Sequence, residues 1–272
     1  MSVEVNGTPR YNASWYLSPR VIERFSWVLV PAIFLLCWEF ASQTGLVDAR
    51  IIPAPSSVLL TIISMSKEGS LVRDTGVTLA RFIVGMIVGT IPGVVIGLTM
   101  GMFRWVRIAL DPLVAALYPV PRIALFPLIL ILVGMNETSN IIMIALGPFF
   151  TMLITAMAAV LNIDPIYRDV ARNFGTGTKD LYTRVMLPAA MPVLVGGLKV
   201  SIGLALLGTV AAEFLVCDNG LGHVIWNSWQ LLSLSQSMAG LVVTALVGAF
   251  FYMSMDVAER WLVPWQRNSE QN

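Results

Sequence analysis

Long apolar runs alternate with short polar stretches along the chain. A helix that crosses a membrane needs about 20 mostly apolar residues, and several runs reach roughly that length. Prolines interrupt the third run, and broken helices occur at membrane depth where they are buried in protein or line a cavity. The pattern therefore predicts an all-α membrane protein with six transmembrane helices, at about 26–44, 80–101, 112–134, 139–161, 197–217 and 237–257.

The composition supports this interpretation. Hydrophobic residues make up 57% of the chain and charged residues only 12%, and the mean hydropathy is +0.78. Soluble domains are close to half apolar and a quarter charged. The formal net charge of +1 gives no field that would attract nucleic acid, so the chain is not expected to bind it.

Lysine and arginine residues gather in alternate connections between the predicted spans. They occur in the tails 1–25 and 258–272 and in the polar segment 164–188, whereas the connections 134–140 and 218–230 contain none. Cytoplasmic loops of membrane proteins carry the excess of positive charge. The pattern therefore predicts that both tails and the segment 164–188 face the cytoplasm.

The connection 46–80 departs from this charge pattern, because it also carries cations. Acidic residues accompany them, and loops of this length weigh less in the positive-inside rule. Its segment 55–69 is predicted to form an amphipathic helix that lies on the outer surface.

The polar segment 164–188 predicts two short helices. Asp164 can cap the first helix with its side-chain oxygen, and Pro165 suits the first helical position. Gly175 is placed for a left-handed stop after this helix. A second helix is predicted to begin at Thr178 and to end at Pro188. Apolar residues share a face of each helix: Ile166, Val170 and Phe174 in the first, with Tyr167 and Ala171 beside them, and Leu181 and Val185 in the second.

Two helices this short are not stable alone, so the adjoining spans must hold them. Their apolar faces suit a groove on a partner protein. The alternative is a basic loop that only sets the orientation in the membrane. The stretch 175–179 also looks like part of a phosphate-binding loop, but it lacks the full G-x-x-x-x-G-K-[ST] pattern after a buried strand.

This segment resembles the cytoplasmic signature of permease subunits of ATP-binding-cassette importers. That signature reads Glu-Ala-Ala, three residues, Gly, nine residues and then Ile-x-Leu-Pro. The spacing matches throughout, and three positions depart from the pattern: Asp169 stands for Glu, Val170 for Ala and Val185 for Ile. The corresponding residues of this chain are Asp169, Val170, Ala171, Gly175, Val185, Leu187 and Pro188.

The resemblance extends through 78–101, 119–140 and 211–226 and points to the branch that imports nitrate, sulfonates, taurine and related compounds. It implies a type I importer permease fold over residues 26–257, in the inner membrane of a bacterial-type cell. It also implies that the segment 164–188 is a coupling helix that inserts into a groove of a separate ATPase subunit. ATP and Mg²⁺ would bind to that partner, and no cofactor to this chain. The implied partners are two ATPase copies, a soluble substrate-binding protein and a second permease copy.

Arg122 and Glu213 are charged residues inside the predicted spans, where ionisable groups are costly and are usually functional or paired. Arg122 stands among Pro119, Pro121 and Pro127, and Glu213 is the only acid of its apolar run. Arg122 is predicted to line the path of a small anionic solute such as a sulfonate, taurine, nitrate or another organic acid, and Glu213 is predicted as a second residue of this path. The alternative is a structural ion pair between Arg122 and Glu213.

Glycines recur every four residues along the second predicted span and form a flat ridge on one helix face. The simpler interpretation is tight packing against another helix. The functional alternative is a surface that slides during gating. The ridge consists of Gly85, Gly89, Gly93, Gly97 and Gly101.

The sequence contains no recognisable catalytic or metal-binding pattern. His223 is the only histidine, and Cys37 and Cys217 match no metal or redox spacing. A secondary transporter is an alternative, but it would usually show two halves with matched interrupted helices. An intramembrane lipid-modifying enzyme is another, and it would need clustered acids or histidines within the spans. The sequence therefore predicts a transporter subunit and not an enzyme.

Overall fold

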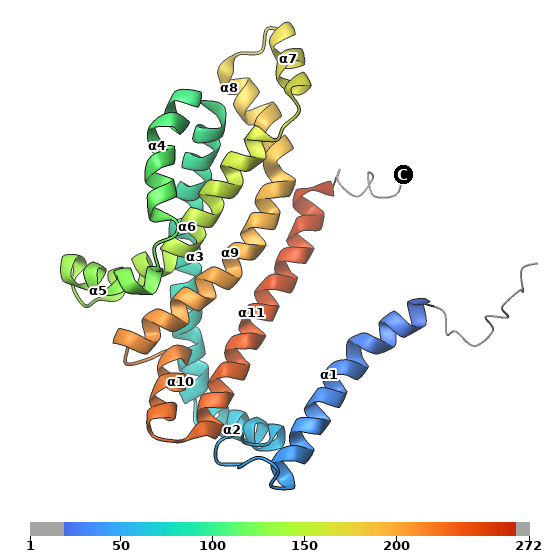
Figure 1. Cartoon of the computed structure of the whole chain (residues 1–272), viewed down its shortest axis with the longest axis vertical. Coiled ribbons are helices and arrows are strands. Elements are labelled where there is room, and N and C mark those ends of the chain that lie inside the picture. Colours follow the sequence, from blue (N-terminus) through green and yellow to red (C-terminus); the bar gives the residue numbers. More distant parts are fainter. Residues whose placement is uncertain (1–18, 265–272) are drawn as a thin grey trace, which may run out of the picture. The chain divides into compact units, whose positions relative to one another are not determined.

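The computed structural model describes residues 19–264, and this part of the chain contains helices and no strand (Figure 1). The chain divides into two units, Met1–Ser57 and Val58–Asn272. Most of the predicted tail 1–25 lies outside the described residues, and so does the end of the predicted tail 258–272.

The first unit contains helix α1 (Pro19–Gln43) and the turn that follows it. The hydroxyl of Ser42 donates a hydrogen bond to the carbonyl of Ile52 (3.0 Å), which folds the turn back onto the end of the helix. The predicted span 26–44 falls on α1. The apolar part of this helix that can be assessed, Leu29–Gln43, is shorter than the spans of the second unit.

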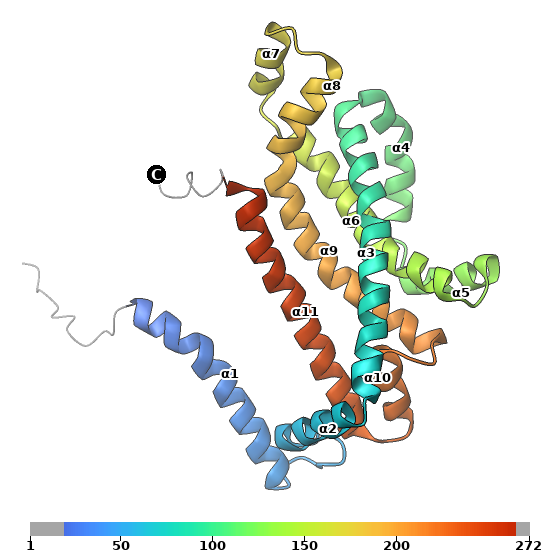
Figure 2. The same ribbon diagram turned by 180° about the vertical axis from the view of Figure 1, so that it is seen from behind.

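The second unit contains four long helices that lie side by side (Figures 1 and 2). Helix α6 packs against both α3 and α9, and α11 packs against α9. All four are long and apolar enough to cross a membrane, and they confirm the helices predicted for the second, fourth, fifth and sixth spans. Their bounds are Ser70–Met102 for α3, Glu137–Leu161 for α6, Leu187–Val216 for α9 and Leu234–Leu262 for α11.

The third predicted span is broken into two helices, as its prolines indicated. Helices α4 (Arg104–Leu117) and α5 (Arg122–Val133) meet at an angle of 101°. Pro121 disfavours a helical conformation at the preceding residue, Val120, so one helix cannot run through the joint. Beyond the bend, α5 packs against α6 and α9.

Several helices differ from the predicted pattern near the ends of the spans, and α9, for example, begins at Leu187 and not at 197. Helix α3 begins at Ser70 and not at 80, because Asp74 and Arg81 are buried among polar partners and need not be kept out of the helix bundle. The predicted connection 218–230 contains a further helix, α10 (Leu221–Gln230), which packs against α9 and α11. The helix predicted at 55–69 is confirmed as α2, Pro55–Lys67.

The glycine ridge of α3 explains how closely α3 and α6 pack. All five glycines of the ridge are buried. A Cβ atom on Gly89, Gly93 or Gly97 would collide with backbone carbonyl groups of α6, at Ala145 and at two positions further along. The interpretation as tight packing is therefore confirmed, while sliding during gating stays a prediction.

Candidate functional site

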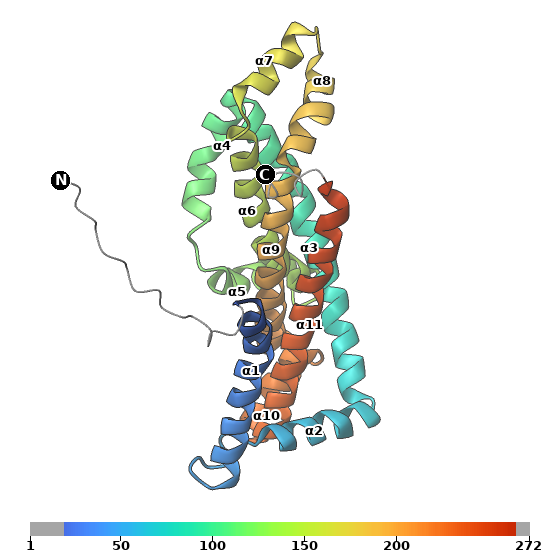
Figure 3. The same ribbon diagram turned by 90° about the vertical axis from the view of Figure 1, so that its right-hand side faces the viewer.

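The segment 164–188 lies beyond the ends of the long helices α6 and α9 (Figures 1 and 3). Helix α7 spans Pro165–Asn173, and Asp164 Oδ1 accepts a hydrogen bond from the N–H of Ile166 (2.9 Å), which confirms the predicted cap. Gly175 has a φ of +71°, in the left-handed region, so the predicted stop is also confirmed.

The second helix of this segment does not end at Pro188, so that prediction is wrong. Helix α8 (Thr178–Asp180) runs into a π-helical stretch, η1 (Leu181–Met186), which continues as α9. In the π-helical stretch the N–H of Leu187 reaches back five residues to the carbonyl of Tyr182. Pro188 follows this π-helical stretch, at the N-terminal end of α9. The segment is thus joined to a span without a break.

The segment has one buried face and one exposed face. Ala171 and Leu181 are buried, and they pack in a cluster with Leu98 of α3 and Val160 of α6. On the other side, Phe174 is 85% exposed. Buried side chains therefore fasten the segment to the spans, while other apolar side chains remain uncovered. The exposed apolar residues of α7 and its end are Ile166, Tyr167, Val170 and Phe174.

The residues that match the importer signature divide between these two faces. Val185 and Leu187 pack against the same cluster as Ala171, so the structure brings these three together. Ala171 is buried, Val185, Leu187 and Pro188 are half-buried, and Asp169, Val170 and Gly175 are exposed.

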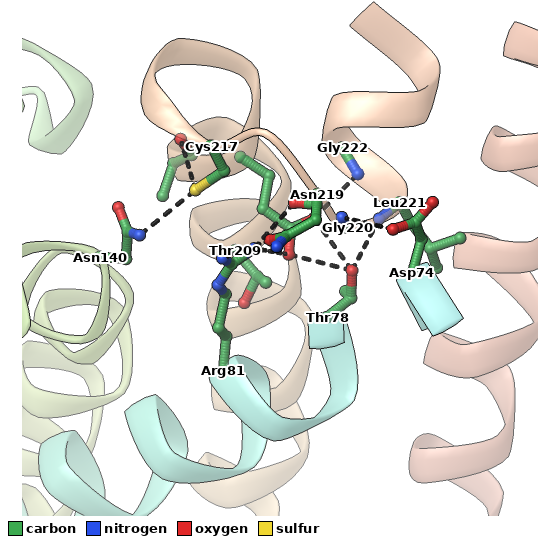
Figure 4. A network of polar contacts seen from close by, with 12 residues as sticks. Asp74, Thr78, Arg81, Asn140, Thr209, Cys217, Asn219, Gly220, Leu221 and Gly222 are labelled. Carbon is green, nitrogen blue, oxygen red and sulfur yellow. Dashed lines mark hydrogen bonds and ion pairs between the residues drawn. The ribbon is translucent and has the colours of Figure 1, made fainter. Parts of the chain in front are cut away.

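A polar network joins α3, α6 and α9 at their ends away from the segment 164–188. Arg81 of α3 is at the centre of this network (Figure 4). Arg81 is 5% exposed, and each of its five N–H groups has an acceptor. Nε and Nη2 donate to the carboxylate of Glu137 on α6, and Nη1 donates to Glu213 Oε1 on α9 (3.0 Å). The carbonyl oxygen and the Oδ1 of Asn219 accept the remaining two, at 2.9 and 2.7 Å. A buried cation is tolerated when it is paired in this way.

The same network caps the beginning of α10 with side chains of other helices. The first N–H groups of a helix have no partner within the helix, and a carboxylate is favourable beside them. Thr78 also donates a hydrogen bond to the carboxylate of Glu213 (3.0 Å), so these two capping side chains are bonded to each other. A side chain on Gly220, whose φ is +107°, would collide with Glu213. The capping bonds run from Gly220 N to Asp74 Oδ1 (3.2 Å), from Leu221 N to Thr78 Oγ1 (2.8 Å) and from Gly222 N to Glu213 Oε2 (2.8 Å).

The structure pairs Glu213 with Arg81 and not with Arg122, so the alternative of an Arg122–Glu213 ion pair is wrong. Glu213 is fully buried near the end of α9 and bonds to Arg81 and Thr78. Arg122 begins α5 and lines a cavity of about 360 Å³ that also includes Gly147 of α6. Among the side chains that the structure describes, Arg122 makes no ion pair. The two charges therefore lie in separate environments.

Three residues of the polar network were not predicted from the sequence: Arg81, Glu137 and Asn219. Arg81 carries a signal that could have been used, because it is an isolated cation just inside the predicted span 80–101, as Arg122 is in the next one. Glu137 and Asn219 carry no such signal, since both lie in polar connections where an acid or an amide is ordinary.

No metal site is found in the part of the chain that the structure describes. Among the described side chains, no three His, Cys, Asp or Glu residues are close enough together to hold an ion. Cys37 and Cys217 are both free thiols.

Comparison with known proteins gives a consistent set of matches. The family described as "Binding-protein-dependent transport system inner membrane component" matches residues 93–268. A candidate aliphatic sulfonates transport permease protein of Bacillus subtilis (strain 168) is 30% identical over 99% of both chains. The taurine transport system permease protein of Escherichia coli (strain K12) is 27% identical, over 86% of this chain and 87% of its own length. The riboflavin transport system permease protein of Chloroflexus aurantiacus is 33% identical, over 92% and 96%.

The fold is also similar to that of a solved structure. A chain of the MetNI methionine ABC transporter, in an inward-facing conformation, superimposes with a TM-score of 0.62 at 20% sequence identity. The match covers 72% of this chain and 98% of that chain. At this identity the similarity concerns the fold alone.

Proposed function

Because the chain belongs to the family of binding-protein-dependent transport system inner membrane components, we propose that it forms the membrane path of an importer for small organic anions. It is a permease subunit of an ATP-binding-cassette importer and not an enzyme. Family membership sets aside the secondary transporter and the intramembrane lipid-modifying enzyme. Subunits of this family work with an ATPase and a soluble binding protein in a bacterial inner membrane.

The segment 164–188 is the proposed docking site for the ATPase subunit. The observation that carries this assignment is its division into two faces. Ile166, Val170 and Phe174 are exposed and apolar, as a helix that inserts into a groove requires. Ala171 and the residues around it are packed against three long helices, so a displacement of the segment would be transmitted to the spans. ATP and Mg²⁺ would bind on the partner and not on this chain.

The assembly is proposed to contain two copies of this chain and two ATPase subunits. One coupling segment serves one ATPase subunit, and closed two-fold symmetry is the commonest arrangement of identical subunits. We propose that both tails and the segment 164–188 face the cytoplasm, because lysine and arginine residues gather in them. The Arg81 network, at the other ends of the helices, would then lie toward the outer side.

The solute is proposed to be an organic anion. The named relatives include permeases for sulfonates and for taurine, which carry a sulfonate group. In this chain Arg122 supplies a cation beside a cavity between the two ends of the spanning helices. Glu213 is fully buried and hydrogen bonded, so we assign it to holding α10 and not to the solute path.

Reconstitution in proteoliposomes with the ATPase and the cognate binding protein tests this function. We expect uptake of a sulfonate that requires both the binding protein and ATP. Uptake that persists without the ATPase, or that follows an ion gradient, would overturn the assignment as an ATP-driven importer. Uptake of cations with no uptake of any anion would overturn the proposed solute class.

A further inference from the structure

The cavity at the bend between α4 and α5 has one charged side chain among the described residues that line it. It lies against α6 and α9 and has a volume of about 360 Å³. We propose that it binds an organic anion with a single negative head group and an apolar tail, an inference that rests on the proposed function. The lining residues are Tyr118, Val120, Pro121, Arg122, Ile123, Met143, Gly147, Leu204, Leu207, Gly208 and Ala211.

The cavity lies part-way along the spanning helices, away from both of their ends. Gly147 is near the middle of α6, which spans Glu137–Leu161, and Leu204 and Ala211 belong to the second half of α9. None of its lining residues belongs to the Arg81 network or to the segment 164–188. A solute bound here would therefore be inside the spanning region, separate from the capping network and from the docking face.

Arg122 suits the head group of such a solute. Among the described residues that line the cavity, it is the only charged one. Its guanidinium presents N–H groups in a planar fork that matches the oxygens of a sulfonate or a carboxylate. Tyr118 adds a phenol hydroxyl to the lining, and its ring packs edge-on against Phe150, with the ring centroids 6.4 Å apart. Both residues belong to the bend itself, Tyr118 at the end of α4 and Arg122 at the start of α5.

The rest of the lining suits an apolar tail and not a second charge. Met143, Leu204 and Leu207 contribute aliphatic and thioether groups, and no carboxylate lines the cavity. An ammonium group would lose water here without gaining an ionic partner, which is costly. The volume is within the range of sites for small organic molecules. Alkanesulfonates should therefore bind better than taurine, whose amino group is charged.

The test measures binding to the permease–ATPase complex in lipid nanodiscs without the binding protein. Saturation-transfer difference NMR compares methanesulfonate, butanesulfonate, hexanesulfonate and taurine, with empty nanodiscs as the control for partition into lipid. We expect affinity to rise roughly fourfold for each buried methylene, which corresponds to about 0.8 kcal/mol. Taurine should bind no better than methanesulfonate.

Substitutions separate the head-group contact from the tail contact. Arg122→Gln should weaken all the sulfonates by about tenfold or more, while Arg122→Lys should retain part of the affinity. Arg104→Gln, on α4 and outside the cavity, is the matched control. Leu207→Asn should weaken hexanesulfonate but not methanesulfonate. Leu215→Asn, at another exposed position of α9, is its control and should change neither.

The outcomes distinguish this site from the function on which it rests. Wild-type affinity in the Arg122→Gln complex, equal affinity for taurine and hexanesulfonate, or no binding above empty nanodiscs would each overturn the site. If the same preparation still takes up a sulfonate with ATP and binding protein, the proposed function stands without the site. If the assembled complex takes up no anion, the proposed function fails as well.

Discussion

Arg81 and Glu213 form a buried ion pair between α3 and α9, with Nη1 and Oε1 3.0 Å apart. Arg81 and Glu213 are 132 positions apart in the sequence, and neither retains a free polar atom in this network. The pair ties the beginning of one span to the end of another. It also holds the carboxylate that caps α10, so a single contact connects three helices.

Removal of one partner of this pair should destabilise the permease. In Arg81→Gln the carboxylate of Glu213 stays buried without a counter-charge, which typically costs about 3–5 kcal/mol. The measurement is thermal unfolding of the purified complex, followed by fluorescence-detected gel filtration. Arg73→Gln is the control, because the Arg73 side chain is 72% exposed and its loss should have little effect. The double variant Arg81→Gln with Glu213→Gln should be more stable than the single one. Equal stability of Arg81→Gln and the wild type would contradict the network.

A methyl group at Gly220 should disrupt the start of α10. Gly220 has a φ of +107°, and its added Cβ would collide with the carboxylate of Glu213. We expect Gly220→Ala to lower the free energy of unfolding by more than about 1 kcal/mol. Gly203→Ala in α9 is the matched control, because an added Cβ there meets no atom within 4 Å. If both variants melt at the wild-type temperature, Gly220 is not constrained as described.

A β-branched residue at Gly175 should uncouple ATP hydrolysis from uptake. The left-handed φ of +71° is readily adopted by glycine, so Gly175→Val would change the turn that presents α7. The measurement is the ratio of solute taken up to ATP hydrolysed in proteoliposomes, which should fall while the chain still inserts. Gly177→Val is the control two residues away, because Gly177 has no left-handed φ and open space around it. Normal coupling in Gly175→Val would exclude a functional role for this turn.

The exposed apolar face of α7 should carry much of the affinity for the ATPase. Phe174→Ser removes an 85% exposed aromatic group without disturbing the buried cluster. Side chains of this kind at the centre of an interface contribute about 2 kcal/mol, or roughly thirtyfold in Kd. The measurement is retention of the ATPase on immobilised permease, with unchanged thermal stability of the permease alone. Trp261→Ser, at the end of α11 and also highly exposed, is the control. Undiminished retention in Phe174→Ser would place the docking face elsewhere.

The helices themselves could be predicted to a large extent from the sequence. Four apolar runs predicted the long helices, because runs of this length and hydropathy leave few alternatives to a buried or spanning helix. Local signals also predicted the cap at Asp164 and the left-handed stop at Gly175, since both depend on residues adjacent in the chain. The end predicted at Pro188 was wrong, because the chain continues through a π-helical stretch into α9, and no local signal in the sequence indicated that stretch.

What the sequence determined by itself was the membrane character, the approximate spans and the spacing of the coupling signature, all of which follow from local pattern. Only the tertiary structure decided that Glu213 pairs with Arg81, that Arg122 lines a cavity, and that α3 begins at Ser70. The physical reason is the same in each case. A charged residue in an apolar run is costly until a partner removes the cost, and that partner can come from any distant segment that the fold brings near. The sequence shows where along the chain a charged residue stands. The packing of the helices decides whether that residue meets an opposite charge, a hydroxyl group or a cavity.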